Sequence, residues 1–342
     1  MSENINLKPR NQSIDILKGL GIILVVMGHL DTNGQVSRLI VYSFHMPLFF
    51  FLSGVVAKSV TEVKFIDYFK KIIKTIYLPF FVFVILDIVF KVFYQHQHSF
   101  LVLLKRTILD LTGLNFTNVN SPLWFLLALF VCKFLFYFID KKAIYKYICL
   151  VVCVIFIFTF RYFETEYYKS VVYFWTIPGL AFFIVGNLLR KFYFNINDIV
   201  NRNKIICGVI LLFSLITYIA LFDVSPFVSM KELIIPNPLL YIINSILGII
   251  LITAVSMVIQ KSGILSTFFE FYGKNSIIVL ICHYYFTRKI VEVLFEKIGI
   301  IEYLYSWYTQ IILLIITLII MAILIFISKK YLYFLFGLKK EN

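Results

Sequence analysis

The segment from Ser13 to His29 reads SIDILKGLGIILVVMGH, an apolar run that also carries a carboxylate, an ammonium and an imidazole. Its length is close to the roughly 20 apolar residues that a helix needs to cross the hydrocarbon core of a bilayer. Ionisable side chains inside such a helix are costly, so Asp15, Lys18 and His29 mark a candidate functional site. The segment therefore predicts both a membrane-spanning helix and a site on that helix.

The rest of the chain repeats the apolar pattern. Hydrophobic residues make up 61% of the 342 residues and charged residues only 15%, whereas soluble domains carry about 25% charged residues. We therefore expect an all-α polytopic protein of the cell membrane, with about ten transmembrane helices in a single membrane domain over residues 1–342. The expected helices are 13–31, 39–57, 72–94, 123–139, 147–160, 171–189, 204–222, 238–259, 275–294 and 307–328.

The positive charge is distributed unevenly between the loops. The formal net charge is +14, and alternate loops starting with the N-terminus hold twenty basic residues against nine in the others. Lys and Arg gather in cytoplasmic loops, so this asymmetry places both termini inside, with cytoplasmic tails at 1–12 and 329–342. We read the charge as orientation and expect no nucleic-acid partner. No small-residue cleavage site follows the first helix, so we expect that helix to be retained.

Three ionisable residues of the first helix share one face. Lys18 and His29 are eleven residues apart, which is about three full turns and a rise of about 16 Å. Asp15 precedes Lys18 by three residues and can pair with the ammonium. A purely structural alternative is that Asp15 and Lys18 reach the membrane interface while His29 is a hydrogen-bonded interior residue. Gly21 and Gly28 are small enough to admit a neighbouring helix.

The second apolar stretch contains FHMPLFFFLSG at residues 44–54. Counting the rise per residue places His45 at about the depth of His29, so two imidazoles can face one cavity. Pro47 leaves a backbone carbonyl near residue 43 without its helical donor, which is tolerated where the helix lines a cavity or where another group satisfies that carbonyl. We expect no metal, because no third ligand accompanies the two histidines.

Weaker signals follow in the loops and later helices. Residues 100–114 are half apolar and are expected to lie along the membrane surface. Trp124 opens the fourth apolar stretch, where tryptophan is typical of an interface anchor. The run Gly273-Lys-Asn275-Ser opens the ninth stretch, and His283 falls roughly mid-membrane within it.

Taken in order, these motifs resemble acyltransferase family 3, the ten-helix integral-membrane acyltransferases of bacteria. Asp15-Ile-Leu-Lys18 with His29 eleven residues after Lys18 is similar to the family's first-helix Arg-x10-His signature. The runs at 44–54, Pro122-Leu-Trp124 and 273–276 ahead of His283 follow at matching positions. The fucose 4-O-acetylase-like subgroup looks most similar, and intercellular adhesion protein C is a more distant comparison.

The resemblance implies transfer of an acetyl, succinyl or other acyl group from a cytoplasmic donor, usually acetyl-CoA, to a sugar of a surface polysaccharide. It implies that His29 is catalytic, as general base or covalent acyl carrier, and that Lys18 with Asp15 holds the donor. Lysine replaces the family arginine, and it cannot bind a phosphate bidentately. Residues that would bind or orient the acceptor are His45, Ser53, Trp124, Asn275 and His283.

The expected partners follow from the same resemblance. Acyl-CoA is a co-substrate, and we expect no tightly bound cofactor. Further partners would be a surface glycan or lipid-linked sugar, membrane lipids and other polysaccharide-synthesis proteins, at a bacterial cytoplasmic membrane. An alternative function is a transporter or flippase for the polysaccharide or its lipid-linked precursor. Transporters commonly carry an internal repeat, and the polar first two helices have no counterpart in the second half of the chain.

Overall fold

The computed structural model describes residues 11–30, 36–95, 100–116, 121–162, 170–222, 226–284, 297 and 307–338, and within them the regular structure is helical. A single bridge, between Ser229 and Ile234, is the β-type pairing in this part of the chain. The α-helices are α1 (Gln12–Leu30), α2 (Val36–Val56), α3 (Phe65–Ile72), α4 (Leu78–Gln95), α5 (Phe100–Thr112), α6 (Trp124–Ile139), α7 (Ala143–Thr159), α8 (Val172–Leu188), α9 (Arg190–Arg202), α10 (Lys204–Phe222), α11 (Pro238–Ile259), α12 (Gly263–Lys274), α13 (Ser276–Tyr284) and α15 (Trp307–Tyr331). Short helical turns add η1 (Ile73–Tyr77), η2 (Ser121–Leu123), η3 (Phe160–Tyr162) and η7 (Tyr333–Phe336).

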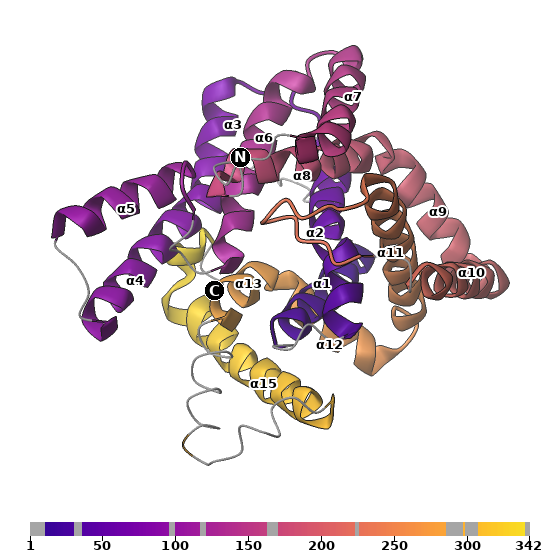
Figure 1. Cartoon of the computed structure of the whole chain (residues 1–342). Helices are drawn as coiled ribbons and strands as arrows, with labels where there is room; N and C mark the ends of the chain where they lie inside the picture. Colours follow the sequence, from indigo (N-terminus) through magenta and orange to yellow (C-terminus); the bar gives the residue numbers. More distant parts are fainter. Residues whose placement is uncertain are drawn as a thin grey trace, which may run out of the picture.

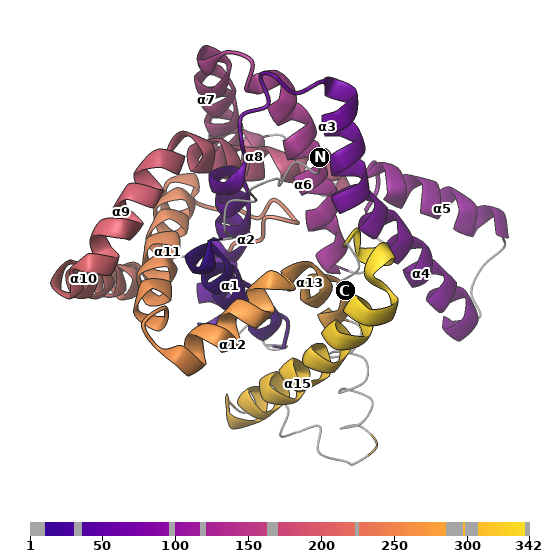
Figure 2. The same cartoon turned by 180° about the vertical axis from the view of Figure 1, so that it is seen from behind.

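Helices α1 and α2 occupy the middle of the molecule in both views, with α4 and α5 on one flank and α9 and α10 on the opposite one (Figures 1 and 2). Helix α1 contacts α2, α11, α12, α13 and α15, and most of its side chains are buried. A helix that is apolar nearly all round and surrounded by others is typical of a membrane-protein interior. The first helix of the chain is therefore also its structural centre.

The predicted apolar stretches overlap helices wherever the structure describes them, although residues 285–294 of the ninth stretch lie outside the described residues; the chain is a multi-pass membrane protein whose described part is helical. Within the described residues, four helices are long and apolar enough to cross a membrane, or up to six if each bent pair forms one span. Four further apolar helices are shorter than that. The count of ten and the cytoplasmic termini stay predictions, and residues 1–10 and 339–342 of the predicted tails lie outside the described residues.

Helix α1 packs backbone against backbone on α12. A Cβ at Gly19 would overlap the carbonyl of Phe269, and a Cβ at Gly273 would overlap the carbonyl of Asp15. Contacts of this kind need small residues, because helices in a bilayer associate through close packing rather than through expulsion of water. The predicted Gly21 and Gly28 also lie at helix contacts, but they meet side chains of α2.

The end of α2 is held by polar groups of α8 and the segments beside it. The carbonyl of Ala57 accepts from Asn187 at 3.2 Å and from the Arg190 guanidinium at 2.7 Å. Cationic donors suit this place, because the last carbonyls of a helix lack helical partners and carry partial negative charge. The chain is thereby fastened where it leaves α2.

A buried carboxylate continues this polar region. Asp140 accepts from the backbone N–H of Val60 at 2.7 Å and from the Ser59 hydroxyl at 2.8 Å, and it pairs with Lys146 at 2.6 Å. Burial alone would raise the pKa of Asp140, but the hydrogen bonds from Lys146, Val60 and Ser59 outweigh burial and lower that pKa. The carboxylate is therefore charged and ties the segment after α2 to α6 and α7.

Candidate functional site

The three candidate residues of the first helix lie on one uninterrupted helix. Asp15 is buried near its start, while Lys18 and His29 are each only partly buried. Because α1 is continuous over Gln12–Leu30, the rise of about 16 Å between Lys18 and His29 holds in the structure. The side chains of Lys18 and His29 thus reach partly open positions at different depths of an otherwise buried helix.

All three membrane histidines are fixed in the same way. The Nδ1 atoms of His29, His45 and His283 lie 3.0, 2.7 and 2.9 Å from the carbonyls of the residues four positions earlier. A carbonyl can only accept, so Nδ1 carries the proton in each ring and Nε2 of the neutral ring keeps its lone pair. His45 and His283 are 4% and 0% exposed, so of the three His29 is the one that a substrate reaches most easily.

His29 stands among aromatic rings from two other helices, α2 and α13. The ring of His283 meets it edge-on at 5.1 Å between centroids, and Tyr284 lies at 6.1 Å. The ring of Tyr42 stacks on that of His29 at 6.2 Å between centroids and in turn lies 4.9 Å from the ring of His45. His283 is therefore the direct neighbour of His29, whereas the ring of Tyr42 links His29 to His45.

Tyr42 and Tyr284 were not singled out from the sequence. Tyr284 directly follows His283, and Tyr42 precedes His45 by three residues, which puts it on the same face of α2. That spacing was the available signal. Apolar periodicity could not distinguish these two tyrosines from the other tyrosines of the chain.

A sharp bend between α12 and α13 precedes the segment that places His283 beside His29. Helices α12 and α13 are bent by 72° where the predicted Gly273–Ser276 run lies. The Asn275 side chain donates to the carbonyl of Phe271 at 2.8 Å and so satisfies a carbonyl at the end of α12. In this structure Asn275 therefore stabilises the bend between α12 and α13. Helix α13, which carries His283, contacts α1.

The Ser43 carbonyl, which lacks a helical donor because of Pro47, accepts a hydrogen bond from another helix. The Ser245 hydroxyl of α11 donates to the carbonyl of Ser43 at 2.8 Å, the position that a proline at 47 leaves without its helical N–H. The Ser43 hydroxyl is also hydrogen bonded to the Tyr218 hydroxyl at 2.6 Å. Of the two alternatives for this carbonyl, a cavity beside the helix or another donor, the structure shows another donor, and α2 is fastened to α10 and α11 beside His45.

Two further candidate residues lie elsewhere. Ser53 follows His45 by eight residues, about 12 Å along the helix, next to Gly54 whose backbone packs on the carbonyl of Phe183. Trp124 is only 5% exposed and packs edge-on against Trp175 at 5.8 Å. Trp124 thus packs inside the helix bundle, and its predicted place at the membrane interface stays a prediction. The preceding turn η2 does contact α13, which carries His283.

Lys18 belongs to a group of three lysines. Lys133 of α6 lies within electrostatic range of both Lys18 and Lys71 of α3. Lys133 lies in the predicted stretch 123–139 and was not predicted as a site residue. Three like charges repel one another, so the group favours an anionic partner. In the described part of the chain, no three His, Cys, Asp or Glu side chains gather closely enough to hold a metal ion.

Comparison with known proteins gives one match. The model of acyltransferase family 3, described as an acyltransferase domain, matches residues 11–327. No curated protein and no solved structure matches the chain. The matched region contains every candidate residue discussed above.

Proposed function

Since the chain belongs to acyltransferase family 3, we propose that it transfers an acetyl or succinyl group from cytoplasmic acyl-CoA to a hydroxyl of a surface or lipid-linked polysaccharide. The chain is an acyltransferase with several apolar helices of membrane-spanning length. The donor is charged and cytoplasmic, whereas the acceptor sugar is on the other face or on a lipid carrier. A reactive group held between helices in a partly open position lets the two substrates meet, and the proposed setting is a bacterial cytoplasmic membrane.

The observation that carries the proposal is the state of His29. Its Nδ1 proton is held by the Val25 carbonyl at 3.0 Å, so Nε2 presents a lone pair from a partly open position. An imidazole suits general-base catalysis because its ordinary pKa is near neutral. Nε2 takes the proton of the acceptor hydroxyl while the oxygen attacks the thioester carbonyl. The C–S bond then breaks, and the CoA thiolate takes the proton from the imidazolium.

A covalent route uses the same atom. Nε2 attacks the thioester carbonyl, the C–S bond breaks and the CoA thiolate leaves. The acyl-imidazolium then passes its acyl group to the oxygen of the sugar hydroxyl, the hydroxyl proton goes to the CoA thiolate, and Nε2 regains its lone pair. In either route His283 and Tyr42, which flank the His29 ring, orient that ring or contact the acceptor. Tyrosine faces around His29 also suit the apolar face of a sugar ring.

The donor end of the proposal rests on the lysine group. Acyl-CoA carries several phosphate charges. Lys133 lies within electrostatic range of both Lys18 and Lys71. Lysine binds phosphate as a point charge, so several lysines can together do what one bidentate arginine does elsewhere. Asp15, one turn before Lys18, is proposed to orient the ammonium.

The test uses deletion cells carrying single variants. His29→Ala should lower the ester content of surface glycan, measured by mass spectrometry, by about 100-fold or more, the usual contribution of a general base. His98→Ala is the matched control, since His98 is not a candidate residue. Normal esterification by His29→Ala at wild-type protein levels would refute the role of His29. Glycan that accumulates inside the deletion cells would instead support the transporter.

A further inference from the structure

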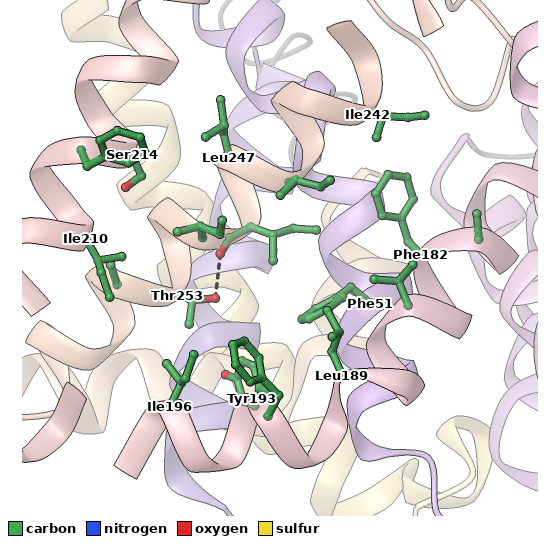
Figure 3. A pocket seen from close by; sticks show the side chains of 18 of the residues that line it. Phe51, Phe182, Leu189, Tyr193, Ile196, Ile210, Ser214, Ile242, Leu247 and Thr253 are labelled. Atoms are coloured by element: carbon green, nitrogen blue, oxygen red, sulfur yellow. Dashed lines mark hydrogen bonds between the residues drawn. The ribbon is translucent and has the colours of Figure 1, made fainter. Parts of the chain in front are cut away.

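A large apolar cavity lies away from His29. It has a volume of about 600 Å³ and is enclosed by α8, α9, α10 and α11, with contributions from α2 and α7 (Figure 3). None of the eight candidate site residues lines it. Its walls are almost entirely hydrocarbon, and side chains of α10 such as Val209 and Phe213 line it while remaining 61% and 67% exposed. Such a rim opens the cavity toward the bilayer.

The hydroxyl groups that line the cavity differ in whether they have a hydrogen-bond partner. Thr253 donates to the carbonyl of Ile249 at 2.7 Å, and Ser214 donates to the carbonyl of Leu211 at 3.1 Å. Each of these two hydroxyls is thus used within its own helix. The Tyr193 hydroxyl is also buried, yet it has no hydrogen-bond partner among the described residues. A buried donor without a partner costs about 1–3 kcal/mol, so whatever fills the cavity should bring an acceptor to Tyr193.

The volume limits the occupant. An apolar cavity of roughly 150 Å³ holds one benzene molecule. About 600 Å³ therefore accommodates roughly two dozen carbon atoms. That is one long fatty-acyl chain, and it is too small for a long polyisoprenoid.

Charge at the nearby helix bend indicates the headgroup. Helix α9 turns away from α8 by 61°, and Arg190 and Lys191 stand at this bend, less than one turn before Tyr193. Lys191 is exposed. Basic side chains beside a membrane helix attract anionic lipid headgroups. The hydroxyl and the cationic bend thus lie at the same end of the apolar cavity.

We propose that this cavity binds one acyl chain of an anionic phospholipid, with the Tyr193 hydroxyl donating to an ester carbonyl and the headgroup lying beside Lys191. Phosphatidylglycerol satisfies each feature: a single chain matches the volume, its ester supplies the acceptor, and its phosphate supplies the charge. The site is distinct from the His29 region, and it does not depend on the proposed acyl transfer.

Native mass spectrometry of the purified full chain in mild detergent tests the site, with dioleoyl-phosphatidylglycerol as the probe. We expect one retained lipid per chain and weaker retention of dioleoyl-phosphatidylcholine. Tyr193→Phe keeps the ring and removes only the hydroxyl, so the fold is preserved and apparent affinity should fall about tenfold, or roughly 1.4 kcal/mol. Tyr241→Phe is the matched control, because Tyr241 is another buried tyrosine but does not line the cavity.

A second variant addresses the cavity itself. Ala181→Phe places a ring in the wall and should abolish stoichiometric retention without affecting the Tyr193 hydroxyl. Equal retention by wild type, Tyr193→Phe and Ala181→Phe would overturn the proposal, and so would a wild-type chain that retains no lipid. Equal affinity for phosphatidylcholine would overturn the choice of an anionic headgroup. Esterification of surface glycan, measured in parallel, reports separately on the His29 region.

Discussion

Replacing Ser245 by alanine should destabilise the protein through a carbonyl on another helix. The Ser245 hydroxyl donates to the carbonyl of Ser43 at 2.8 Å, and these residues are 0% and 5% exposed. Pro47 has no N–H, so the helix cannot supply the missing donor. A buried group that loses its partner costs about 1–3 kcal/mol, whereas interhelical hydrogen bonds in membrane proteins average about 0.6 and reach about 1.7 kcal/mol. We expect Ser245→Ala to cost about 1–2 kcal/mol.

A double-mutant cycle separates this carbonyl from other effects of the substitution. Pro47→Ala provides an N–H four residues after Ser43, so Ser245→Ala should cost about 1 kcal/mol less in that background. Ser256→Ala is the matched control on α11: Ser256 is 1% exposed and donates to the Thr253 carbonyl of its own helix at 2.7 Å. Its loss should cost only a few tenths of a kcal/mol.

The assay is denaturant titration of the purified protein in detergent micelles, which gives the free energy of unfolding of each variant. The reasoning fails if Ser245→Ala costs the same with Pro47 and with Ala at that position. It also fails if Ser245→Ala and Ser256→Ala are equally destabilising, since that would show a general effect of losing a serine hydroxyl from α11.

Two further predictions concern helix packing and pH. Gly273→Ala places a methyl group on the Asp15 carbonyl and should cost about 1–3 kcal/mol or more in the same titration, whereas Gly263→Ala meets nothing within 4 Å and should be neutral; equal effects would contradict the close approach. The pKa of Asp140 is lowered by its hydrogen bonds, although burial opposes this, so its contribution is present above the ordinary value of about 4 and is lost as pH falls through the folded-state pKa. Asp140→Asn should flatten this acid-side loss of stability, and an unaltered pH profile would exclude the carboxylate as its source.

The apolar stretches were predictable because a bilayer imposes one requirement on every spanning segment. The predicted stretches overlap helices in the described part of the chain, and the residue bounds of 238–259 agree with those of α11. Helices α3, α9 and α12 were not predicted as separate elements. They carry charged and polar residues, as in Arg190-Lys-Phe-Tyr-Phe-Asn-Ile-Asn-Asp at the start of α9, so a search for uniformly apolar runs passes over them.

The candidate site was predictable residue by residue but not as an arrangement. The sequence indicated that Pro47 leaves a carbonyl in need of a donor, yet Ser245 lies 202 positions away and nothing local marks it as the donor. The sequence also paired His29 with His45 by depth. The position of a residue along its helix does not say which neighbouring helix its side chain faces. The edge-on contact of His29 with His283 therefore became visible only with the fold.

The bent pair α12–α13 touches the central helix at two levels. At the lower level Gly273 lies against the Asp15 backbone, and at the upper level His283 lies against His29. The two contacts are fourteen residues apart on the continuous helix α1, roughly 21 Å. The bent pair therefore sets the position of His283 along α1, because Gly273 fixes one part of the pair against Asp15 while His283 lies against His29 at the other. A displacement at Gly273 would misalign the two imidazoles without any change at either ring.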